Sequence, residues 1–467
     1  MTIIKKYLNA YPPSLTDVYL LIMDCLRHDM VDYEIGGQPL MPNLKRFSDS
    51  SARFRNAFAS APTTHFAVPT ILTGVLPFTL HDKQGITPDV RYLPAFLSEK
   101  GFETYGYTTN AVTSHIFGYS RGFRIFHDFL DSSEISWTYR MRKKLVHFLE
   151  NLPPGKRRFY DALMLPVTLF MKLTGWQLNP EMMNYKITRM MDGSNIIDAL
   201  GRDLEGNGGD NRFFFLHFVD THAPYAPPER YMEDLIPRKY RTRSYLQRFF
   251  HMVYRDEEKV LNDPVLRKRN LDLYLSACKY QDHLFGRFLE MVRDESGDTD
   301  PLILIMADHG EAFGEHGYLQ HRRTKFSGPH IRIPLIVKGP GIENGEYSGL
   351  VDETDILPMI LRKLGLSHGE TEHDPFGKGK DMILTLGYSG TYSLTTRKVR
   401  FISDDTGRSL YSFEDVEERS PRNLNDEVSS LFERQAGAVK ERARSSLDER
   451  EVLKDRIRAI SSGTLKK

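Results

Sequence analysis

VYLLIMD, residues 18–24, is an uninterrupted apolar run that ends in an aspartate. Three further apolar runs have the same character: FFFLHFV (213–219), LILIMA (302–307) and PLIVKG (334–339). Continuous runs of this length are typical of strands that are buried on both faces. Segments with helical spacing lie between them, such as YLPAFLSEKG (92–101) and LDLYLSACKYQDHLFGRFLEMVRD (271–294). The sequence therefore predicts an α/β fold with a doubly wound, mainly parallel central sheet.

The chain is expected to divide into three parts. Residues 1–373 form the main α/β domain, with an insertion at about 134–178. In residues 374–422, short alternating stretches separated by Gly and Asp turns predict a small antiparallel α+β subdomain. Residues 423–467 are charged with helically spaced apolar residues, which predicts a helical tail.

The composition excludes several classes of protein. Lys and Arg total 63 against 62 for Asp and Glu, so the net charge gives no argument for a nucleic-acid partner. The two cysteines, Cys25 and Cys278, exclude a disulfide framework and fit a reducing compartment. The N-terminal segment has no apolar stretch long enough for a signal peptide core, and no window approaches the length of a spanning helix, so we expect a cytoplasmic protein.

Acidic residues directly follow three of the apolar runs: Asp24, Asp220 and Asp308. Ligands of open α/β sheets bind at the carboxyl ends of the strands. One aspartate at such a position is commonly the N-cap of the next helix. Three of them, two with nearby histidines in DTH and DHG, favour metal binding over capping for Asp24 and Asp308.

The segment APTTHFAVPTILTG, residues 61–74, places two threonines before a short apolar helix. Such a threonine can be a plain N-cap. The same position is where backbone N–H groups and the helix dipole favour an anionic phosphate or sulfate. A hydroxyl there becomes a nucleophile if its pKa is lowered, which a divalent cation held by Asp24 and Asp308 would do.

Two further segments carry histidines. In MADHGEAFGEHGYLQH (306–321), Asp308 and His309 leave a strand together, a carboxylate and imidazole pair suited to Zn²⁺, Mn²⁺ or Ca²⁺. His316 and His321 follow in a Gly-rich loop, where a single histidine is more often an ordinary surface residue. The segment HFVDTHAPYAPP (217–228) adds Asp220 and His222.

Taken in order, several blocks of the chain resemble the signature blocks of the sulfatase-like family of the alkaline phosphatase superfamily. They are VYLLIMDCLRHD, MPNLKRFSDSSARFRNAFASAPTTHFAVPTILTG, GFETYGYTTNAVTSHIFGYSRGF, FFFLHFVDTHAPYAPPERY, ADHGEAFGEHG and IPLIVKGPG. They span most of residues 17–365, and SLYSFEDVEERSPRNL resembles a later block of the family. The resemblance implies that residues 1–373 are a metal-dependent catalytic domain.

Carried over residue by residue, the resemblance implies one divalent ion held by Asp24, Asp308 and His309. It places Thr64 at the position of the nucleophile, which completes the metal site. His222 matches a histidine that contacts the transferred group. His321 falls where many members have a lysine, and would neutralise a non-bridging oxygen or protonate the leaving group.

The chain departs from typical sulfatases at two positions. Formylglycine arises from Cys or Ser followed by x-Pro-x-Arg, whereas Thr64 is followed by His, Phe, Ala and Val. The resemblance therefore implies the threonine-nucleophile variant, as in phosphodiesterases, nucleotide pyrophosphatases and phospho-group transferases of the superfamily. Cys25 replaces the second aspartate of typical sulfatases, which favours Mn²⁺ or Zn²⁺, with Ca²⁺ as the alternative.

The expected function is hydrolysis of an anionic ester, a phosphate mono- or diester, through a covalent Thr64 intermediate. The alternatives are a sulfuric ester hydrolase and a phospho-group transferase acting on a glycan or lipid. A non-catalytic anion-binding protein has no physical need for all six residues of the expected site together, which argues against it.

The insertion at about 134–178 raises the question of peripheral membrane contact. Basic residues at 140–144 and 156–158 flank the apolar stretch 163–176, as in an interfacial helix that meets anionic lipid. A helical hairpin that packs its apolar face on the sheet explains the same pattern, and its near-helical leucine spacing favours it slightly.

Overall fold

The computed structural model describes residues 17–77, 85–87, 90–129, 192–206, 211–297, 299–366, 374–415, 420–422, 424 and 426–441. The predicted insertion at about 134–178, with its proposed membrane contact, lies outside the described residues. None of the helices in the described residues is long and apolar enough to cross a membrane.

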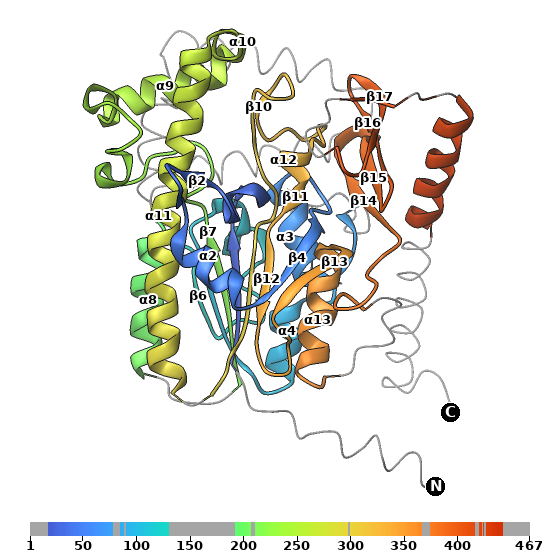
Figure 1. The fold of residues 1–467 in the computed structure, drawn as a ribbon. Helices are drawn as coiled ribbons and strands as arrows, with labels where there is room; N and C mark the ends of the chain where they lie inside the picture. Colours follow the sequence, from blue (N-terminus) through green and yellow to red (C-terminus); the bar gives the residue numbers. More distant parts are fainter. Residues whose placement is uncertain are drawn as a thin grey trace, which may run out of the picture.

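A nine-stranded sheet forms the centre of the molecule (Figure 1). Its order is β11-β4-β12-β8-β1-β7-β5-β6, and β13 pairs with β4. The bounds are β1 Val18–Met23, β4 Ala52–Phe58, β5 Glu103–Thr108, β6 Ile125–His127, β7 Arg212–Phe218, β8 Leu302–Met306, β11 Arg332–Ile333, β12 Leu335–Lys338 and β13 Gly345–Asp352. The strands from β8 to β6 run parallel, whereas β12 is antiparallel to β8 and β4. The predicted mainly parallel sheet is confirmed.

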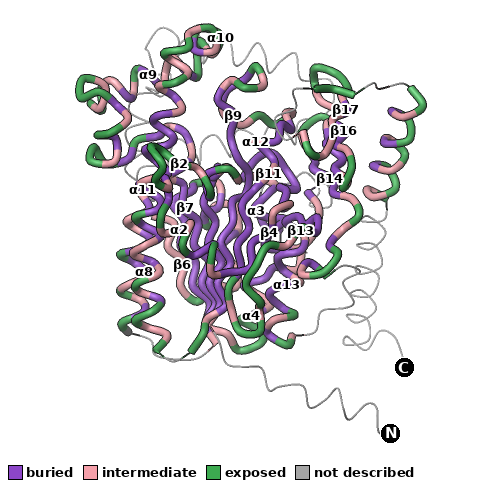
Figure 2. Tube along the Cα trace, viewed as in Figure 1, coloured by how far each residue is buried: buried purple, intermediate pink, exposed green. Residues whose placement is uncertain are grey.

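Strand β1 lies in the middle of this sheet and is completely buried (Figure 2). Val18 pairs with Phe213 of β7 on one side and with Leu302 of β8 on the other. Tyr19 stacks on Phe214 with ring centroids 4.6 Å apart. Burying an apolar side chain of this size stabilises a fold by roughly 1.5–3 kcal/mol. The continuous apolar runs thus become core strands, and the carboxyl ends of β1, β7 and β8 finish level with one another.

Helices cover the two faces of the sheet. The helices α2 (Pro42–Asp49), α8 (Ser194–Gly206) and α11 (Pro264–Ser296) pack together on one face. The helices α3 (Thr64–Thr73), α4 (Leu93–Glu99) and α13 (Ile356–Lys363) pack together on the other (Figure 1). The remaining elements include α9 (Arg243–Arg255), α10 (Glu257–Asn262), α12 (Gly328–Ile331), β2 (Glu34–Ile35), β3 (Gln38–Pro39), β9 (Ala312–Phe313) and β10 (Leu319–Gln320).

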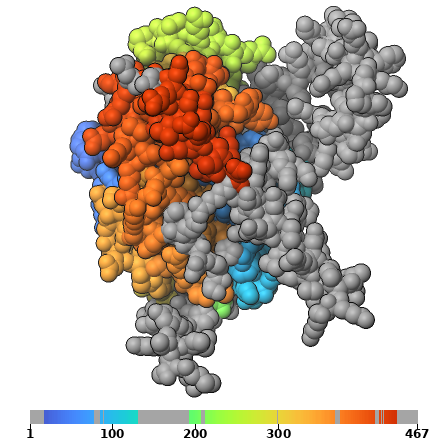
Figure 3. Space-filling model, turned by 90° about the vertical axis from the view of Figure 1, so that its right-hand side faces the viewer, coloured from blue at the N-terminus to red at the C-terminus, as the bar shows by residue number. Residues whose placement is uncertain are grey.

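A four-stranded antiparallel sheet follows towards the C-terminus. It consists of β14 (Met382–Leu386), β15 (Tyr392–Thr396), β16 (Val399–Asp404) and β17 (Gly407–Ser412), in sequence order. Residues 426–441 are helical, and Phe432 of this helix stacks on Phe401 with centroids 5.2 Å apart. Figure 3 shows these C-terminal residues covering one side of the molecule. The predicted small antiparallel sheet is confirmed, and the division of the chain at residues 373 and 422 stays a prediction.

Candidate active site

The candidate site lies where the carboxyl ends of β1, β7 and β8 meet the N-terminus of α3. Directly after β1, Asp24 donates its backbone N–H to the carbonyl of Phe218 at 2.9 Å. The next residue, Cys25, has a φ of 63°, in the left-handed region of the backbone that residues other than glycine rarely adopt. Its N–H donates to Oδ1 of Asp308 at 3.3 Å. This sharp turn brings the ends of β1 and β8 together around two buried carboxylates.

Thr64 is the first residue of α3 and is buried. Its Oγ1 lies 3.1 Å from Nε2 of His309 and 3.4 Å from Oδ2 of Asp24. Thr63 occupies the N-cap position, and its side chain makes no capping hydrogen bond. The hydroxyl of Thr64 therefore faces the strand-end residues, in agreement with the position expected for it.

The residues expected to hold a divalent ion fit one. Oδ1 of Asp24 and Oδ2 of Asp308 are buried and have no hydrogen-bond partner among the described residues. Nε2 of His309 lies 3.6 Å from Oδ2 of Asp308 and 4.0 Å from Oδ1 of Asp24. Nδ1 of His309 lies 3.0 Å from the carbonyl of Gly310, which leaves Nε2 as the ligand atom. Two carboxylates, an imidazole and a hydroxyl are a donor set that suits Mn²⁺ or Zn²⁺.

The electrostatics of the site also favour a cation. Burial and the neighbouring charge of Asp24 raise the pKa of Asp308 to about 6. Burial, and secondarily His321, lowers the pKa of His309 to about 3, so its imidazole is neutral and can act as a ligand. Burial opposes ionisation of Asp24, but His222 and His217 together hold its pKa well below the usual range. Two carboxylates thus lie close together, and their ion-pair partners among the described residues are histidines and not lysine or arginine.

Two polar residues that the sequence analysis did not single out hold Asp24. Asn110 donates from Nδ2 to Oδ2 of Asp24 at 2.6 Å. His217 lies in β7 with Nε2 3.4 Å from the same oxygen, and its Nδ1 lies 3.0 Å from Oγ1 of Thr113. The signal for His217 was a single imidazole inside the apolar run FFFLHFV. For Asn110 the signal was weaker, an amide directly after the polar pair that ends a strand.

His321 and His222 come together beside this centre, with ring centroids 5.0 Å apart. The ring of His321 also lies 4.5 Å from the ring of His309. Nδ1 of His321 lies 3.0 Å from Oε1 of Glu311, a completely buried carboxylate that the sequence analysis also missed. Burial acts against protonation, but Glu311 outweighs it and raises the pKa of His321. The structure therefore brings all six expected site residues into one cluster, while their roles stay predictions.

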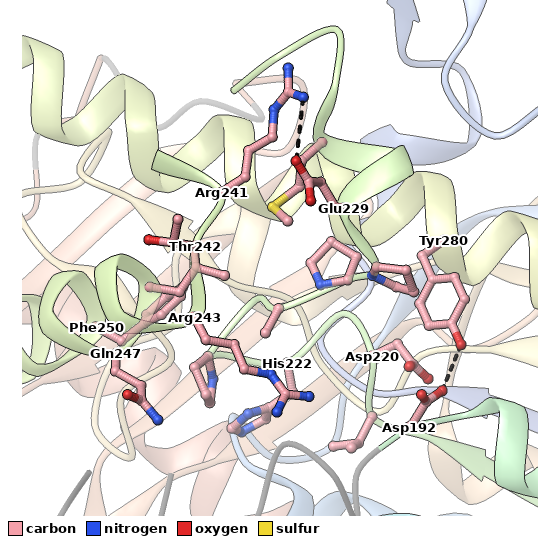
Figure 4. Close-up of a pocket in the computed structure, with 17 residues that line it drawn as sticks. Asp192, Asp220, His222, Glu229, Arg241, Thr242, Arg243, Gln247, Phe250 and Tyr280 are labelled. Carbon is pink, nitrogen blue, oxygen red and sulfur yellow. Dashed lines mark hydrogen bonds and ion pairs between the residues drawn. The ribbon is translucent and has the colours of Figure 1, made fainter. Parts of the chain in front are cut away.

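Asp220 does not join this cluster. Its Oδ1 accepts a hydrogen bond from the backbone of Gly193 at 3.1 Å, and burial raises its pKa to about 8. Asp220, Asp192 and Tyr280 line a cavity of about 530 Å³ that His222 also lines (Figure 4). Figure 4 shows Arg243 of α9 reaching into the cavity from the opposite side. The cavity offers space next to the cluster for part of a substrate.

Comparisons with known proteins extend over most of the chain. A sulfatase of Formosa agariphila is 21% identical over 385 residues, which are 76% of this chain and 70% of that protein. A choline-sulfatase of Rhizobium meliloti is 28% identical over 116 residues, which are 25% of this chain and 22% of that protein. The shorter match therefore spans about a fifth of the length of the choline-sulfatase.

Solved structures share the fold at low sequence identity. The phosphonate monoester hydrolase of Agrobacterium radiobacter superimposes with a TM-score of 0.61 and 15% identity, over 92% of this chain and 96% of that chain. The lipoteichoic acid synthase LtaP from Listeria monocytogenes gives a TM-score of 0.54 and 15% identity, over 93% and 92% of the two chains. The family model described as Sulfatase matches residues 16–366, three quarters of the sequence. The chain therefore belongs to the sulfatase family, metal-dependent ester hydrolases of the alkaline phosphatase superfamily.

Proposed function

We propose that this chain hydrolyses a phosphate mono- or diester, with Thr64 as the covalent nucleophile. The observation that carries the proposal is the position of Oγ1 of Thr64. It lies at the first residue of α3, 3.1 Å from Nε2 of His309 and 3.4 Å from Oδ2 of Asp24. A threonine in this position cannot become formylglycine, so the hydroxyl itself is the group available for attack.

The surroundings of Thr64 suit an anionic phosphoryl group. The ten-residue helix α3 begins at Thr64, so its N-terminal end and the positive end of its dipole face the site. Asp24, Asp308 and His309 would hold one divalent ion. When bound, such an ion supplies positive charge that lowers the pKa of a neighbouring hydroxyl and stabilises a developing oxyanion.

The chemistry proceeds in two balanced steps. In the first, Oγ1 of Thr64 releases its proton to solvent and bonds to phosphorus, while the bond from phosphorus to the ester oxygen breaks. The departing oxygen takes up a proton, for which His321 is the candidate donor, and leaves as an alcohol. In the second, water gives a proton back to His321 and bonds to phosphorus, while the bond from phosphorus to Oγ1 breaks. Oγ1 regains a proton from solvent, and inorganic phosphate or a monoester is released. His222, between the cluster and the cavity, would contact the transferred group.

Two other reactions use the same residues. A sulfate ester in place of the phosphate ester would make the chain a sulfatase that works directly through Thr64, and the Formosa relative carries the name sulfatase. A second alcohol in place of water would make it a phospho-group transferase on a glycan or lipid. The similarity in fold to a lipoteichoic acid synthase gives that alternative its support. A non-catalytic anion-binding protein is the weakest alternative, because buried carboxylates without partners are costly unless a cation is bound.

The test compares four aryl substrates on the full chain: a phosphate monoester, a phosphodiester, a phosphonate monoester and a sulfate ester. Mn²⁺, Zn²⁺ and Ca²⁺ are supplied one at a time. We expect the phosphate esters to be cleaved fastest, and acid quenching followed by peptide mass spectrometry should find phosphate on Thr64. Faster cleavage of the sulfate ester, or sulfate on Thr64, would identify the sulfatase alternative. No turnover of any substrate with any metal would contradict the proposal.

A further inference from the structure

Cys25, His222 and His321 form a second potential ligand set beside the one already described. Each of the three offers one ligand atom, and these atoms lie within 4.8 Å of one another. None of them belongs to the set Asp24, Asp308 and His309. A thiolate and two imidazoles are the donors that zinc prefers, and three protein ligands leave one position open for an exogenous ligand.

The thiol of Cys25 lies between the two ligand sets. Cys25 has a φ of 63° and is completely buried. Its N–H donates to Oδ1 of Asp308 at 3.3 Å, and its carbonyl accepts a hydrogen bond from the hydroxyl of Tyr274 at 3.0 Å. These hydrogen bonds hold the backbone of Cys25 at both its amide and its carbonyl. Its Sγ lies 3.7 Å from Nδ1 of His321 and 3.7 Å from Nδ1 of His309.

Both imidazoles are oriented by an acceptor at Nδ1. Nδ1 of His321 lies 3.0 Å from Oε1 of Glu311, and Nδ1 of His222 lies 2.5 Å from the carbonyl of Ala223. A proton on Nδ1 that is donated to a carboxylate or a carbonyl leaves the lone pair on Nε2. This is the arrangement that metal-binding histidines adopt, with the outer acceptor fixing the tautomer and the ring orientation.

The charges of the buried cluster call for positive charge besides one divalent ion. Asp24, Asp308 and Glu311 are all completely buried. Each has one oxygen without a hydrogen-bond partner among the described residues: Oδ1, Oδ2 and Oε2, respectively. One divalent ion offsets two of the three carboxylates. The third, Glu311, is offset either by a protonated His321 or by a second cation that a neutral His321 holds. An uncompensated charge in such an interior is strongly unfavourable.

We propose that Cys25, His222 and His321 bind a second divalent cation, Zn²⁺, with Glu311 as the outer acceptor that orients His321. On binding, the thiol of Cys25 releases its proton to solvent and the Sγ–Zn²⁺ bond forms. The inference rests on the proposed function and deepens it, because this cation would lie on the side of His222 and of the cavity. The leaving oxygen would then be stabilised by a cation that His321 holds, in place of a proton from His321.

The test measures metal content and a spectroscopic signature of the full chain. After loading with Zn²⁺ and removal of the excess, we expect two equivalents in the wild type and one in Cys25→Ala. His222→Asn, at a partly exposed position, should also bind one. Cys278→Ala is the matched control, because Cys278 is equally buried but lies within α11, and it should bind two equivalents. Loading with Co²⁺ should give a thiolate-to-cobalt charge-transfer band in the wild type and in Cys278→Ala, but not in Cys25→Ala. Glu311→Gln should weaken the second equivalent by about 10–100-fold.

Each outcome decides between the two proposals. A wild type that saturates at one equivalent and shows no charge-transfer band overturns the second site and leaves the proposed function intact. Two equivalents that survive in Cys25→Ala and in His222→Asn also overturn it. If the wild type binds no metal at all, the proposed function fails together with the second site. Circular dichroism of each variant separates loss of a ligand from loss of the fold.

Discussion

At the amino ends of β1 and β7 an arginine pairs with two carboxylates, whereas at the carboxyl ends of β1 and β8 two carboxylates have histidines as their ion-pair partners among the described residues. Asp17 precedes β1 and Arg212 begins β7. The guanidinium of Arg212 donates from Nε to Oδ2 of Asp17 at 3.0 Å and from Nη1 to Oε1 of Glu295 at 2.7 Å. One cation and two carboxylates thus fix the start of two central strands and the end of α11.

At the other end, Asp24 and Asp308 lie close together, with His217 and His309 as their ion-pair partners among the described residues. The pKa of Asp308 rises to about 6 because burial and Asp24 oppose its ionisation. The ion pairs of Arg212 stabilise the fold. The two buried carboxylates at the carboxyl ends lower the stability of the protein until a cation binds. Such a difference between two ends of the same strands indicates which end carries out chemistry.

The largest expected effect comes from removing the nucleophile. Thr64→Ala should lower kcat/KM by roughly 10³-fold or more, because it removes the atom that forms the covalent intermediate. Thr63→Ala is the matched control, since its hydroxyl makes no capping bond and it should cost far less. Steady-state kinetics on an aryl phosphate measure both variants. Equal and mild effects would contradict the assignment of Thr64.

Asp308→Asn removes one of the two carboxylates at the carboxyl ends of the central strands. We expect loss of bound metal by elemental analysis and a fall in activity of about 10³-fold, since a metal ion contributes several kcal/mol to such a reaction. The metal-free variant should be more stable than the metal-free wild type by about 1–2 kcal/mol at pH 7. The reason is that the unfolded wild type is ionised there, while the pKa of about 6 shows that the folded protein resists ionisation of Asp308. Full metal retention with normal activity would rule out Asp308 as a ligand.

Arg212→Ala removes the ion pairs at the amino ends of β1 and β7. It leaves Asp17 and Glu295 without their shared cation, so the free energy of unfolding should fall by about 3 kcal/mol. Metal content of the folded protein should stay unchanged, because the site lies at the opposite end of the strands. Arg293→Ala, an exposed arginine paired with Asp294, is the control and should change stability by under about 1 kcal/mol. Denaturant titration followed by metal analysis would reveal any loss of metal, which would show that the two ends are coupled.

The smallest effect concerns Asp220, whose pKa rises from 3.8 to about 8 on folding. Between these values the unfolded chain has lost the proton that the folded protein keeps, so the stability of the wild type falls as the pH rises. Asp220→Asn removes this loss and can still accept the hydrogen bond from Gly193. The variant should therefore be more stable than the wild type at pH 8 and no more stable than the wild type at pH 4, measured as Tm. A difference that does not change with pH would contradict the buried protonation of Asp220.

The core strands and most of the site could be predicted from the sequence, because both depend on local signals. An apolar run that ends in aspartate marks β1 and β8, and parallel strands bring their ends together whatever the rest of the chain does. Asn110, His217 and Glu311 were missed because their roles depend on long-range contacts. Asn110 meets Asp24 from a different strand end, and nothing in its local sequence distinguishes it from a turn residue.

The direction of β12 could also not be predicted from the local sequence pattern. PLIVKG reads as a buried strand, and β12 is one, but it runs antiparallel to both of its neighbours. A buried strand has the same apolar pattern in either direction, so the pattern fixes burial and leaves direction open. The position of β11 sets the direction instead, because Arg332 pairs with Phe58 at the carboxyl end of β4 and the chain enters β12 from that end.

The central position of β1 has a consequence for the synthesis of the protein on the ribosome. VYLLIM precedes both of its partners along the chain, which begin at Arg212 and Leu302. Until those partners have been made, this strand is an apolar segment with both hydrogen-bonding edges vacant, which is a hazard for aggregation. Asp24 likewise waits for Asp308 and His309. Metal binding and turnover should therefore appear late in folding, so their recovery after denaturation reports completion of the whole sheet.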